Sequence, residues 1–396
     1  MPGRLKRKTV AVHAGSRLDG SKSIPIAPPV HVSAVSWFEE AEDLDAALDG
    51  KDFSYGRISA QNVVLLEDAV AALEGTEAAA AFPSGMAAIR AVFDAQGFKP
   101  GDLLVMPSDG YGVTRGLLKT LCAERGVELR ALPLAEPSAA DAVRALRPRL
   151  VVAESITNPL LAVPDIRLLA KACKDVGGAL AVDATFPSPA LHRACEFGAD
   201  YAIQSTTKWM NGHSDAIGGS VAGSKERIDP IRAARLYQGA ILGPFEAWLT
   251  LRGLRTLYVR MKAHSEHAEA VARRLQRSAR MERVIYPGLP EDPNYPVARE
   301  LLKGGFGGML AFEIKGAGRV QAFKFLERVK LAKAAPSLGD VTTLVMHPAT
   351  ASARRMTEQE REAAGIHENL VRVSVGLEDP DDIADDLLQA VERAVE

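Results

Sequence analysis

Between residues 61 and 255, segments with the hydrophobic pattern of a strand alternate with segments that have the pattern of a helix. Short apolar runs bounded by turn residues predict buried strands, and apolar residues spaced three or four apart predict amphipathic helices. The strands are predicted at 78–82, 103–106, 150–154, 179–183, 201–205 and 219–223, and the helices at 62–74, 86–96, 115–125, 166–176 and 189–197. Strand–helix repetition of this kind predicts an α/β fold with a mostly parallel sheet flanked by helices.

The pattern differs on either side of this region. Residues 1–60 contain prolines at 25, 28 and 29 and a single helix-like stretch at 41–48, which indicates an extended arm lying on a neighbouring subunit. A disordered tail is the alternative. One long helix is predicted over 244–276, of which 255–276 is amphipathic. It would join a large domain, 61–255, to a smaller α+β C-terminal domain, 256–396. The elements predicted there are strands near 309–314, 343–346 and 370–375 and helices near 319–328, 357–363 and 380–394.

Composition narrows the class of protein. Hydrophobic residues make up 47% of the 396 positions, and 48 basic and 50 acidic side chains leave a net charge of −2, so nothing indicates binding to nucleic acid or to an anionic membrane. No apolar stretch approaches the ~20 residues that span a bilayer, and no apolar segment follows the basic residues at 4–8. The three cysteines, Cys122, Cys173 and Cys195, show no CxxC spacing. We therefore expect a cytoplasmic protein without structural disulfides.

Lys208 is the first candidate for chemistry. It follows the apolar run at 201–205 and the hydroxyl residues Ser205, Thr206 and Thr207. An amine at the mouth of a buried strand is poorly solvated, which favours its neutral, nucleophilic form. Hydroxyls and backbone N–H groups beside it suit a phosphate, so the pattern predicts a Schiff base between Lys208 and pyridoxal phosphate (PLP). A lysine after a strand is more often a solvated loop residue.

Polar residues also end two preceding strands. Glu154 begins the segment that runs to Asn158, and Asp183 ends the strand at 179–183. In open parallel sheets, ligands bind beyond the carboxyl ends of the strands, so these segments and Lys208 are expected to converge. Asp183 would keep a PLP pyridine nitrogen protonated, although a helix cap or turn residue is the alternative.

Three further segments suit an aromatic, phosphorylated cofactor and an amino-acid substrate. Gly85 and Met86 open a helix after a strand, a place where free N–H groups bind phosphate, although an ordinary N-cap has the same pattern. Tyr111 is either a turn aromatic or a ring stacked on the cofactor. Arg372 alternates with valines in a predicted strand, and it is either a surface residue or a bidentate fork for a carboxylate.

The sequence lacks the motifs that are typical of other classes of enzyme. The chain has no GxGxxG, no GxxxxGK[ST] and no HExxH, so a nicotinamide dehydrogenase on a similar sheet and a metal site both lose support. We interpret His213 as structural. A PLP-fold protein that serves only as a binding partner is the remaining alternative, and retention of Lys208, Asp183 and Arg372 argues against it.

Seven segments in order resemble the Cys/Met-metabolism family of PLP enzymes along nearly the whole chain. The family includes cystathionine γ-synthase, cystathionine γ- and β-lyases, methionine γ-lyase and the O-acylhomoserine sulfhydrylases. The resemblance implies the PLP-dependent transferase fold of type I and a PLP cofactor. The segments are Tyr55-Gly-Arg57, Ser84–Ile89, Thr157–Leu161, Asp183–Pro189, Ser205–Asp215, Ser337–Asp340 and Leu370–Asp379.

The resemblance also implies residue roles. Lys208 would hold PLP and shuttle protons, Asp183 would pair with the pyridine nitrogen, and Tyr111 would stack on the ring. Asn158 would lie near the ring hydroxyl. The phosphate ligands would be Gly85, Met86, Ser205 and Thr207 from one subunit and Tyr55 and Arg57 from its neighbour, and the substrate carboxylate would bind Arg372 and Ser337. Shared sites imply a homo-oligomer, at least a dimer, and a homotetramer is expected.

The cofactor residues are all present, but several positions differ from the family's usual pattern. They are Ser59–Asn62 after Tyr-x-Arg, Ala184, Ala351–Ala353, Pro336 before Ser337, and Val113. These differences bear on substrate choice. We expect a carbon–sulfur lyase that acts by γ- or β-elimination on a sulfur amino acid such as methionine or cystathionine, with Tyr111 as proton donor. The alternative is a γ-replacement transferase, either cystathionine γ-synthase or an O-acylhomoserine sulfhydrylase.

Overall fold

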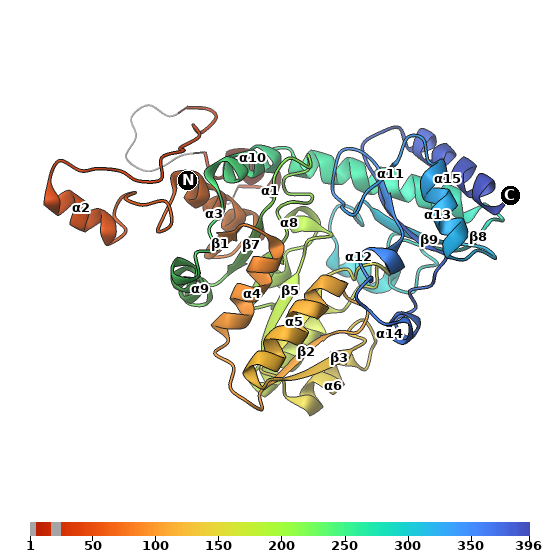
Figure 1. The fold of residues 1–396 in the computed structure, drawn as a ribbon, viewed down its shortest axis with the longest axis horizontal. Coiled ribbons are helices and arrows are strands. Elements are labelled where there is room, and N and C mark those ends of the chain that lie inside the picture. Colours follow the sequence, from red (N-terminus) through yellow and green to blue (C-terminus); the bar gives the residue numbers. More distant parts are fainter. Residues whose placement is uncertain (1–4, 17–24) are drawn as a thin grey trace.

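A seven-stranded sheet forms the centre of the larger part of the molecule in the computed structural model, which describes residues 5–16 and 25–396 (Figure 1). Strand β7 is antiparallel to both its neighbours, and the other neighbouring strands are parallel. The predicted mostly parallel α/β sheet is therefore confirmed. Its order is β1 (Ala78–Phe82), β7 (Gly219–Gly223), β6 (Tyr201–Gln204), β5 (Ala179–Asp183), β4 (Leu150–Glu154), β2 (Leu103–Pro107) and β3 (Glu128–Leu132).

Helices cover both faces of this sheet, which explains its continuous apolar strands. In β5, Leu180 and Val182 pack into one core and Ala179 and Ala181 into the other. A strand buried on both faces has no polar side, so it reads as an unbroken apolar run. One core contains helices α3 (Gln61–Glu74), α6 (Ala139–Leu146) and α7 (Ile166–Val176), and the other α4 (Gly85–Ala95), α5 (Gly112–Arg125) and α9 (Lys225–Gln238).

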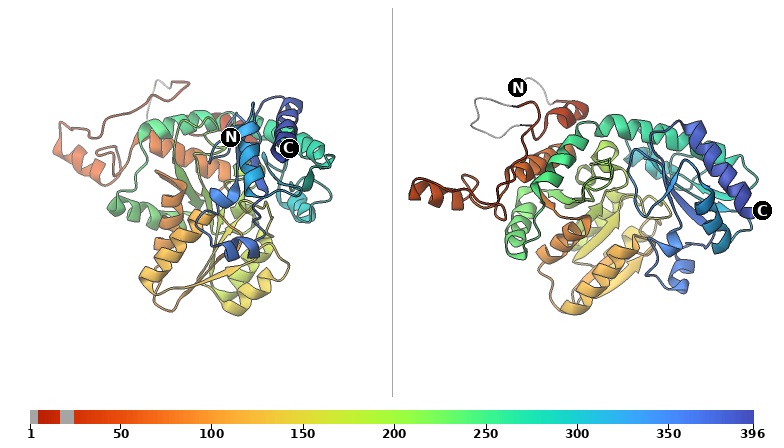
Figure 2. Two further views of the ribbon diagram at one scale, coloured as in Figure 1. Left: turned by 45° about the vertical axis from the view of Figure 1, so that its right-hand side comes forward. Right: turned by 45° about the horizontal axis from the view of Figure 1, so that its top comes forward.

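A second, smaller sheet carries the C-terminal elements. Its order is β10 (Lys333–Ala334), β11 (Leu344–Met346), β12 (Leu370–Ser374), β9 (Met309–Ile314) and β8 (Met281–Ile285), with only β10 and β11 parallel. Alternate residues of β9 and β12 pack into a core with α11 (Leu257–Gln276), α13 (Arg319–Arg328) and α15 (Pro380–Val395). Figure 2 shows α11 running from the large sheet to the small one. The expected smaller α+β part is present.

Two helix predictions were wrong. The single helix at 244–276 is two helices, α10 (Pro244–Leu254) and α11, because Thr256 leaves helical geometry and the Arg260 guanidinium binds the Gly253 carbonyl oxygen at 2.8 Å. The helix at 189–197 is also divided. Its parts are α8 (Ser188–Leu191) and a 3₁₀ helix, η1 (Ala194–Phe197), separated by the extended, buried His192, whose ring stacks on Phe197.

Several elements lacked a clear pattern and were not predicted. The edge strands β3 and β8 are half exposed and carry charges, and α9 contains Pro230. Short β10 and α12 (Tyr295–Leu301) have too few residues to show a periodicity. Helix α6 was missed although it is as long as the helix predicted at 41–48 and buries one apolar face. Helix α14 (Glu358–Ala363) lies close to its predicted position. No helix in the described ranges is both long enough and apolar enough to cross a membrane.

The N-terminal arm projects from the body of the molecule. Helix α2 (Ala41–Leu48) lies where it was predicted, and Figures 1 and 2 show it well away from both sheets. Helix α1 (Arg7–His13) was missed, because packing of Val10 and Ala11 against the core containing α3, rather than a local repeat, stabilises it. Residues 1–4 and 17–24 of the predicted arm lie outside the described residues.

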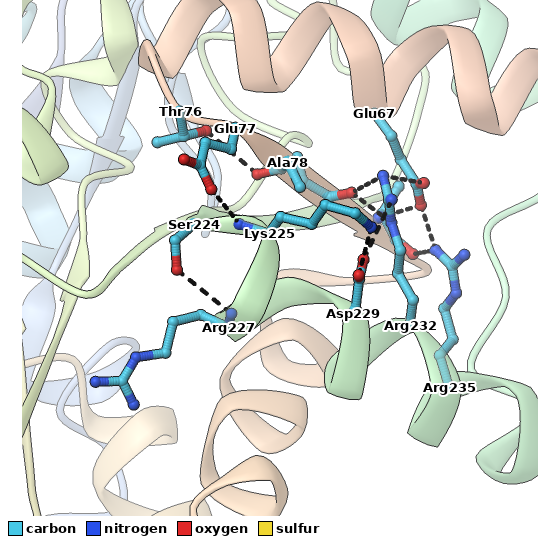
Figure 3. Close-up of polar contacts among 12 residues, drawn as sticks. Glu67, Thr76, Glu77, Ala78, Ser224, Lys225, Arg227, Asp229, Arg232 and Arg235 are labelled. Carbon is cyan, nitrogen blue, oxygen red and sulfur yellow. Dashed lines mark hydrogen bonds and ion pairs between the residues drawn. The ribbon is translucent and has the colours of Figure 1, made fainter.

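The buried carboxylate of Glu67 forms hydrogen bonds and ion pairs along the outer edge of strand β1. Glu67, on α3, accepts the Ala81 N–H at 2.9 Å and pairs with Arg235 and with Arg232, both on α9 (Figure 3). Arg235 also donates to the Ala81 carbonyl at 2.7 Å, and Arg232 to that of Ala79. An edge strand otherwise presents unpaired backbone groups. These side chains satisfy three such groups, the Ala81 N–H and the Ala79 and Ala81 carbonyls, and hold α3, β1 and α9 together.

We expect Glu67→Gln to lower the free energy of unfolding by about 3–5 kcal/mol, the cost of removing one partner of a buried ion pair. Glu67 is only 4% exposed, so the arginines would lose an anion that water cannot replace. Urea denaturation measures the change. Glu77→Gln is the matched control, because Glu77 is exposed and accepts one N–H, and it should change stability by about 0.5 kcal/mol or less. A loss below about 1 kcal/mol for Glu67→Gln would contradict this account.

Candidate active site

A cavity of about 570 Å³ lies at the carboxyl ends of the central strands of the large sheet. Its other wall comes from the C-terminal part of the chain, through residues 336–338 and β12. Most of the predicted site residues line it. They are Gly85, Met86, Tyr111, Asn158, Asp183, Ser205, Thr207, Lys208, Ser337 and Arg372.

Neighbouring strands bring these residues together. In the sheet, β4, β5 and β6 are adjacent and parallel, with Glu154 opposite Asp183 and Asp183 opposite Ile203. The Thr185 hydroxyl accepts the Ser205 N–H at 2.8 Å and so ties the segments that follow β5 and β6. The predicted convergence of strand ends is what the structure shows.

Lys208 extends from the segment after β6 into the cavity. Its Nζ donates to Ser337 Oγ at 2.8 Å. Burial, followed by the positive charge of Arg372, lowers the pKa of the Lys208 amine to about 8. Because deprotonation removes the unfavourable buried charge, this amine is nucleophilic and able to act as a base near neutral pH.

The lowered pKa makes a prediction for the cofactor-free protein. At pH 7.5 roughly a quarter of Lys208 amines would be neutral, against roughly one in a thousand for an ordinary lysine. Acylation of the Lys208 peptide by a trace amine reagent should therefore rise with pH around a midpoint near 8. Arg372→Met should move the midpoint upward, because it removes the nearby positive charge. A midpoint at the ordinary 10.5 in the unsubstituted protein would contradict the assignment.

Asp183 ends β5 at the wall of the cavity. One of its oxygens accepts the Thr185 N–H at 3.0 Å. Burial raises the pKa of its carboxyl, and the hydrogen bonds from Thr185 oppose that rise. The carboxylate lines the cavity, so Asp183 is placed to accept from a protonated ring nitrogen.

The start of α4 provides an anion site on the same wall. Ser84 caps the helix by accepting the Ala87 N–H at 3.1 Å, and the Gly85 and Met86 N–H groups, in the first turn, have no intrahelical acceptor. A Cβ on Gly85 would lie 3.0 Å from the Ser205 side chain, so glycine allows the helix start and Ser205 to meet.

The two predicted hydroxyl ligands differ in their present bonding. Ser205 Oγ forms no hydrogen bond with the described residues. Thr207 Oγ1, by contrast, donates to the Gly218 carbonyl and accepts the Gly218 N–H, at 3.2 and 3.0 Å. Ser205 can donate to a phosphate directly, whereas Thr207 must first release the Gly218 carbonyl.

Arg372 is fully buried on the opposite wall, on the face of β12 that alternates with its valines. Its Nη1 donates to Asn158 Oδ1 and its Nη2 to the Ser337 carbonyl, both at 2.9 Å. Burial lowers the pKa of the guanidinium to about 10, which leaves it charged at neutral pH. Both acceptors are neutral carbonyl oxygens, so a ligand carboxylate can supply the missing negative charge.

Glu154 was not predicted as a site residue, although it ends β4 just as Asp183 ends β5. Its two oxygens accept the Tyr111 N–H at 2.6 Å and the Asn158 N–H at 2.8 Å. Burial and then the charge of Asp183 raise the pKa of its carboxyl. Glu154 therefore positions two predicted site residues. Its position at the end of a predicted strand was the feature of the sequence that could have identified Glu154 as a site residue.

Tyr55 and Arg57 are the predicted residues that one chain does not bring to the cavity. Arg57 Nη1 donates to the Leu236 carbonyl at 3.0 Å, and its guanidinium lies over the Tyr55 ring. Tyr55 is partly exposed, on the projecting arm. Among the positions that differ from the family's usual pattern, Pro336 lines the cavity, whereas Val113 is a partly exposed residue of α5 outside its lining.

The groups around this cavity fit PLP. An unsatisfied helix N-terminus suits the phosphate, Asp183 presents a carboxylate for the ring nitrogen, and Lys208 presents an amine with a lowered pKa. No set of three or more histidine, cysteine, aspartate or glutamate side chains in residues 5–16 and 25–396 is arranged to hold a metal ion.

Comparisons with known proteins agree with this fit. Residues 8–392 match the family described as "Cys/Met metabolism PLP-dependent enzyme". L-methionine γ-lyase of Pseudomonas putida is 38% identical over 93% of each chain, and O-succinylhomoserine sulfhydrylase of Pseudomonas aeruginosa is 38% identical over 85% of this chain and 83% of its own. The crystal structure of cystathionine γ-synthase from Xanthomonas oryzae pv. oryzae in complex with cystathionine superposes with a TM-score of 0.93, at 36% identity over 99% of both chains. The chain therefore belongs to the Cys/Met-metabolism family of PLP-dependent enzymes.

Proposed function

We propose that the protein is a carbon–sulfur lyase that acts by γ- or β-elimination on a sulfur amino acid such as methionine or cystathionine. One observation carries the proposal: Ser337 contacts Lys208 Nζ through its hydroxyl and Arg372 through its carbonyl. A carboxylate on Arg372 would thus place the neighbouring Cα of an amino acid close to the amine of Lys208. Similarity to L-methionine γ-lyase supports the choice of a lyase.

The residues that line the cavity would each have a separate role in the elimination reaction. Bound PLP supplies an electron sink for the bond broken at Cα. Lys208 would hold the cofactor as a Schiff base and take the Cα proton, and Asp183 would keep the proton on the ring nitrogen. Burial raises the pKa of the Tyr111 phenol, so it stays protonated and able to donate to the leaving sulfur. Asn158 would lie near the ring hydroxyl.

The phosphate would bind to the first turn of α4 and the neighbouring hydroxyls. On one subunit the ligands would be the backbone at Gly85 and Met86 with the side chains of Ser205 and Thr207. The helix N-terminus favours a doubly charged anion here. Tyr55 and Arg57 would complete the phosphate site from the adjacent subunit.

A γ-replacement transferase is the second candidate. It would use the same cofactor residues, and similarity to an O-succinylhomoserine sulfhydrylase supports it. A product assay on the purified holoenzyme separates the two. A lyase should release a 2-oxo acid, ammonia and a thiol from methionine or cystathionine with no added acceptor. Turnover only of O-acylhomoserines, and only with an added thiol, would instead assign the transferase.

We also propose a homo-oligomer, built from dimers with shared sites and reaching a homotetramer. The arm supports this, because Ile26, Val32 and Trp37 on it are 89%, 76% and 80% exposed. Several large apolar residues exposed on one segment are typical of a protein interface. The free cysteines support a reducing compartment such as the cytoplasm.

Mixing two inactive variants tests the shared site. Under subunit exchange, Arg57→Ala and Lys208→Ala proteins in equal amounts should recover about a quarter of wild-type activity, because half of the dimers would be mixed and each would carry one intact site. Activity should be assayed at limiting PLP, where Arg57→Ala is expected to lose the cofactor. Mixing Lys208→Ala with Asp183→Ala is the control. Both lie in one chain's cavity, so no recovery is expected, and equal recovery in both mixtures would contradict shared sites.

A further inference from the structure

The cavity contains a second arginine that the cofactor and the α-carboxylate do not use. Arg354 lines the cavity together with Arg372, but unlike buried Arg372 it is exposed to solvent. Its side chain makes no hydrogen bond or ion pair with any residue in the described part of the chain. Arg361, in the same segment, is by contrast paired with Glu368 at 3.3 Å. The charge of Arg354 is therefore available to a ligand.

The backbone that carries Arg354 is held firmly against the large sheet's layer of helices. Arg354 lies in the turn after the 3₁₀ helix η2 (Pro348–Thr350). A Cβ on Gly112 would lie only 2.3 Å from the Ser352 carbonyl oxygen, so this turn packs directly on the start of α5, next to Tyr111. Glu360, on α14, fixes the following segment by pairing with Arg115 and Lys119 of α5, at 3.3 and 2.8 Å.

The acidic groups of the cavity do not neutralise Arg354. Glu154 uses both its oxygens for backbone N–H groups, and Asp183 lies at the end of β5 with one oxygen on Thr185. Ser352 also lines the cavity, and its buried hydroxyl has no hydrogen-bond partner among the described residues. A guanidinium with a hydroxyl on the same turn is a typical receptor for a carboxylate.

We propose that Arg354, assisted by Ser352, selects amino acids whose γ-substituent ends in a second carboxylate. Arg372 binds the α-carboxylate, which every amino acid carries, and Arg354 binds the distal one. Cystathionine and O-succinylhomoserine belong to this class, whereas methionine and O-acetylhomoserine do not. The inference rests on the proposed function, since it places the substrate in the same cavity, and it holds for either elimination or replacement.

Two unreactive ligands test the proposal on the holoenzyme. L-2-aminosuberate has its second carboxylate as many bonds from Cα as cystathionine has, and L-2-aminooctanoate has a methyl group there instead. Calorimetry should show that the wild type prefers the aminosuberate. Arg354→Gln should weaken aminosuberate binding by roughly 3- to 10-fold, because solvent screens a contact made by an exposed guanidinium, and leave aminooctanoate unchanged. Arg354→Lys should restore part of the preference.

Arg355→Gln is the matched control, because Arg355 is exposed, as Arg354 is, but does not line the cavity. It should leave both affinities at the wild-type values. Equal loss for both ligands in Arg354→Gln, or equal loss in the two variants, would overturn the proposal. A loss of PLP affinity in Arg354→Gln would also overturn it and assign Arg354 to the phosphate. If the wild type bound neither ligand, the proposed function would fail, not only the role of Arg354.

Discussion

Lys208→Ala is expected to reduce turnover by at least about 10²- to 10⁴-fold, the range that a positioned general base contributes. Lys208 is the lysine that lines the cavity, and its amine is the group placed to move the proton at Cα. Alanine cannot hold the cofactor covalently or accept that proton. Steady-state kinetics at saturating PLP, with each substrate that the wild type converts, measure the loss.

Lys225→Ala is the control for removing a lysine, because Lys225 lies exposed at the start of α9 and pairs with Asp229. It should keep the wild-type rate. The Lys208→Ala protein should also keep its fold. The Lys208 amine contacts the neutral Ser337 hydroxyl, so its removal leaves no buried carboxylate without a partner. Thermal unfolding of the cofactor-free proteins checks this point. A rate within tenfold of wild type for Lys208→Ala would remove Lys208 from the reaction.

Arg372→Lys is expected to cost about 30- to several-thousand-fold in kcat/KM, which corresponds to the roughly 2–5 kcal/mol of a lost buried charge-assisted contact. Lysine keeps the charge but lacks the planar fork that holds both Asn158 Oδ1 and the Ser337 carbonyl. The loss should be similar for every amino acid converted, because all share the α-carboxylate. Kinetics on at least three substrates measure it.

The cofactor should remain bound in Arg372→Lys, because this residue is not assigned to PLP. The visible absorption spectrum of the purified variant checks occupancy. Substitution of Pro336, which lines the cavity, should instead change the ranking among substrates. If Arg372→Lys left every substrate within a factor of about two of wild type, another basic residue would have to bind the α-carboxylate.

Local pattern was enough to predict the centre of the fold and to mark most of the cavity residues as candidates, whereas their roles and the inclusion of Ser337 came from the family resemblance. Strands such as β4 and β5 are buried on both faces, so their apolar runs end sharply at Glu154 and Asp183. Parallel pairing then places those ends side by side. Lys208 could be included for the same reason, because it follows the next strand of the sheet.

Contacts between distant segments could not be predicted from local pattern. Glu154 holds Tyr111, 43 positions earlier, through a backbone N–H that carries no sequence signal. Arg354 lies in a turn whose packing on Gly112 depends on how the C-terminal segment folds back. The break between α10 and α11 similarly involves the Arg260 side chain, which donates to the Gly253 carbonyl together with the Thr256 N–H.

Reduction of the holoenzyme with borohydride, followed by digestion and mass spectrometry, tests the central claim most directly. The account predicts that the phosphopyridoxyl group is found on the peptide containing Lys208, and that the Lys208→Ala protein yields no such peptide. Recovery of the group on a peptide that lacks residue 208 would contradict the account and place the cofactor outside this cavity.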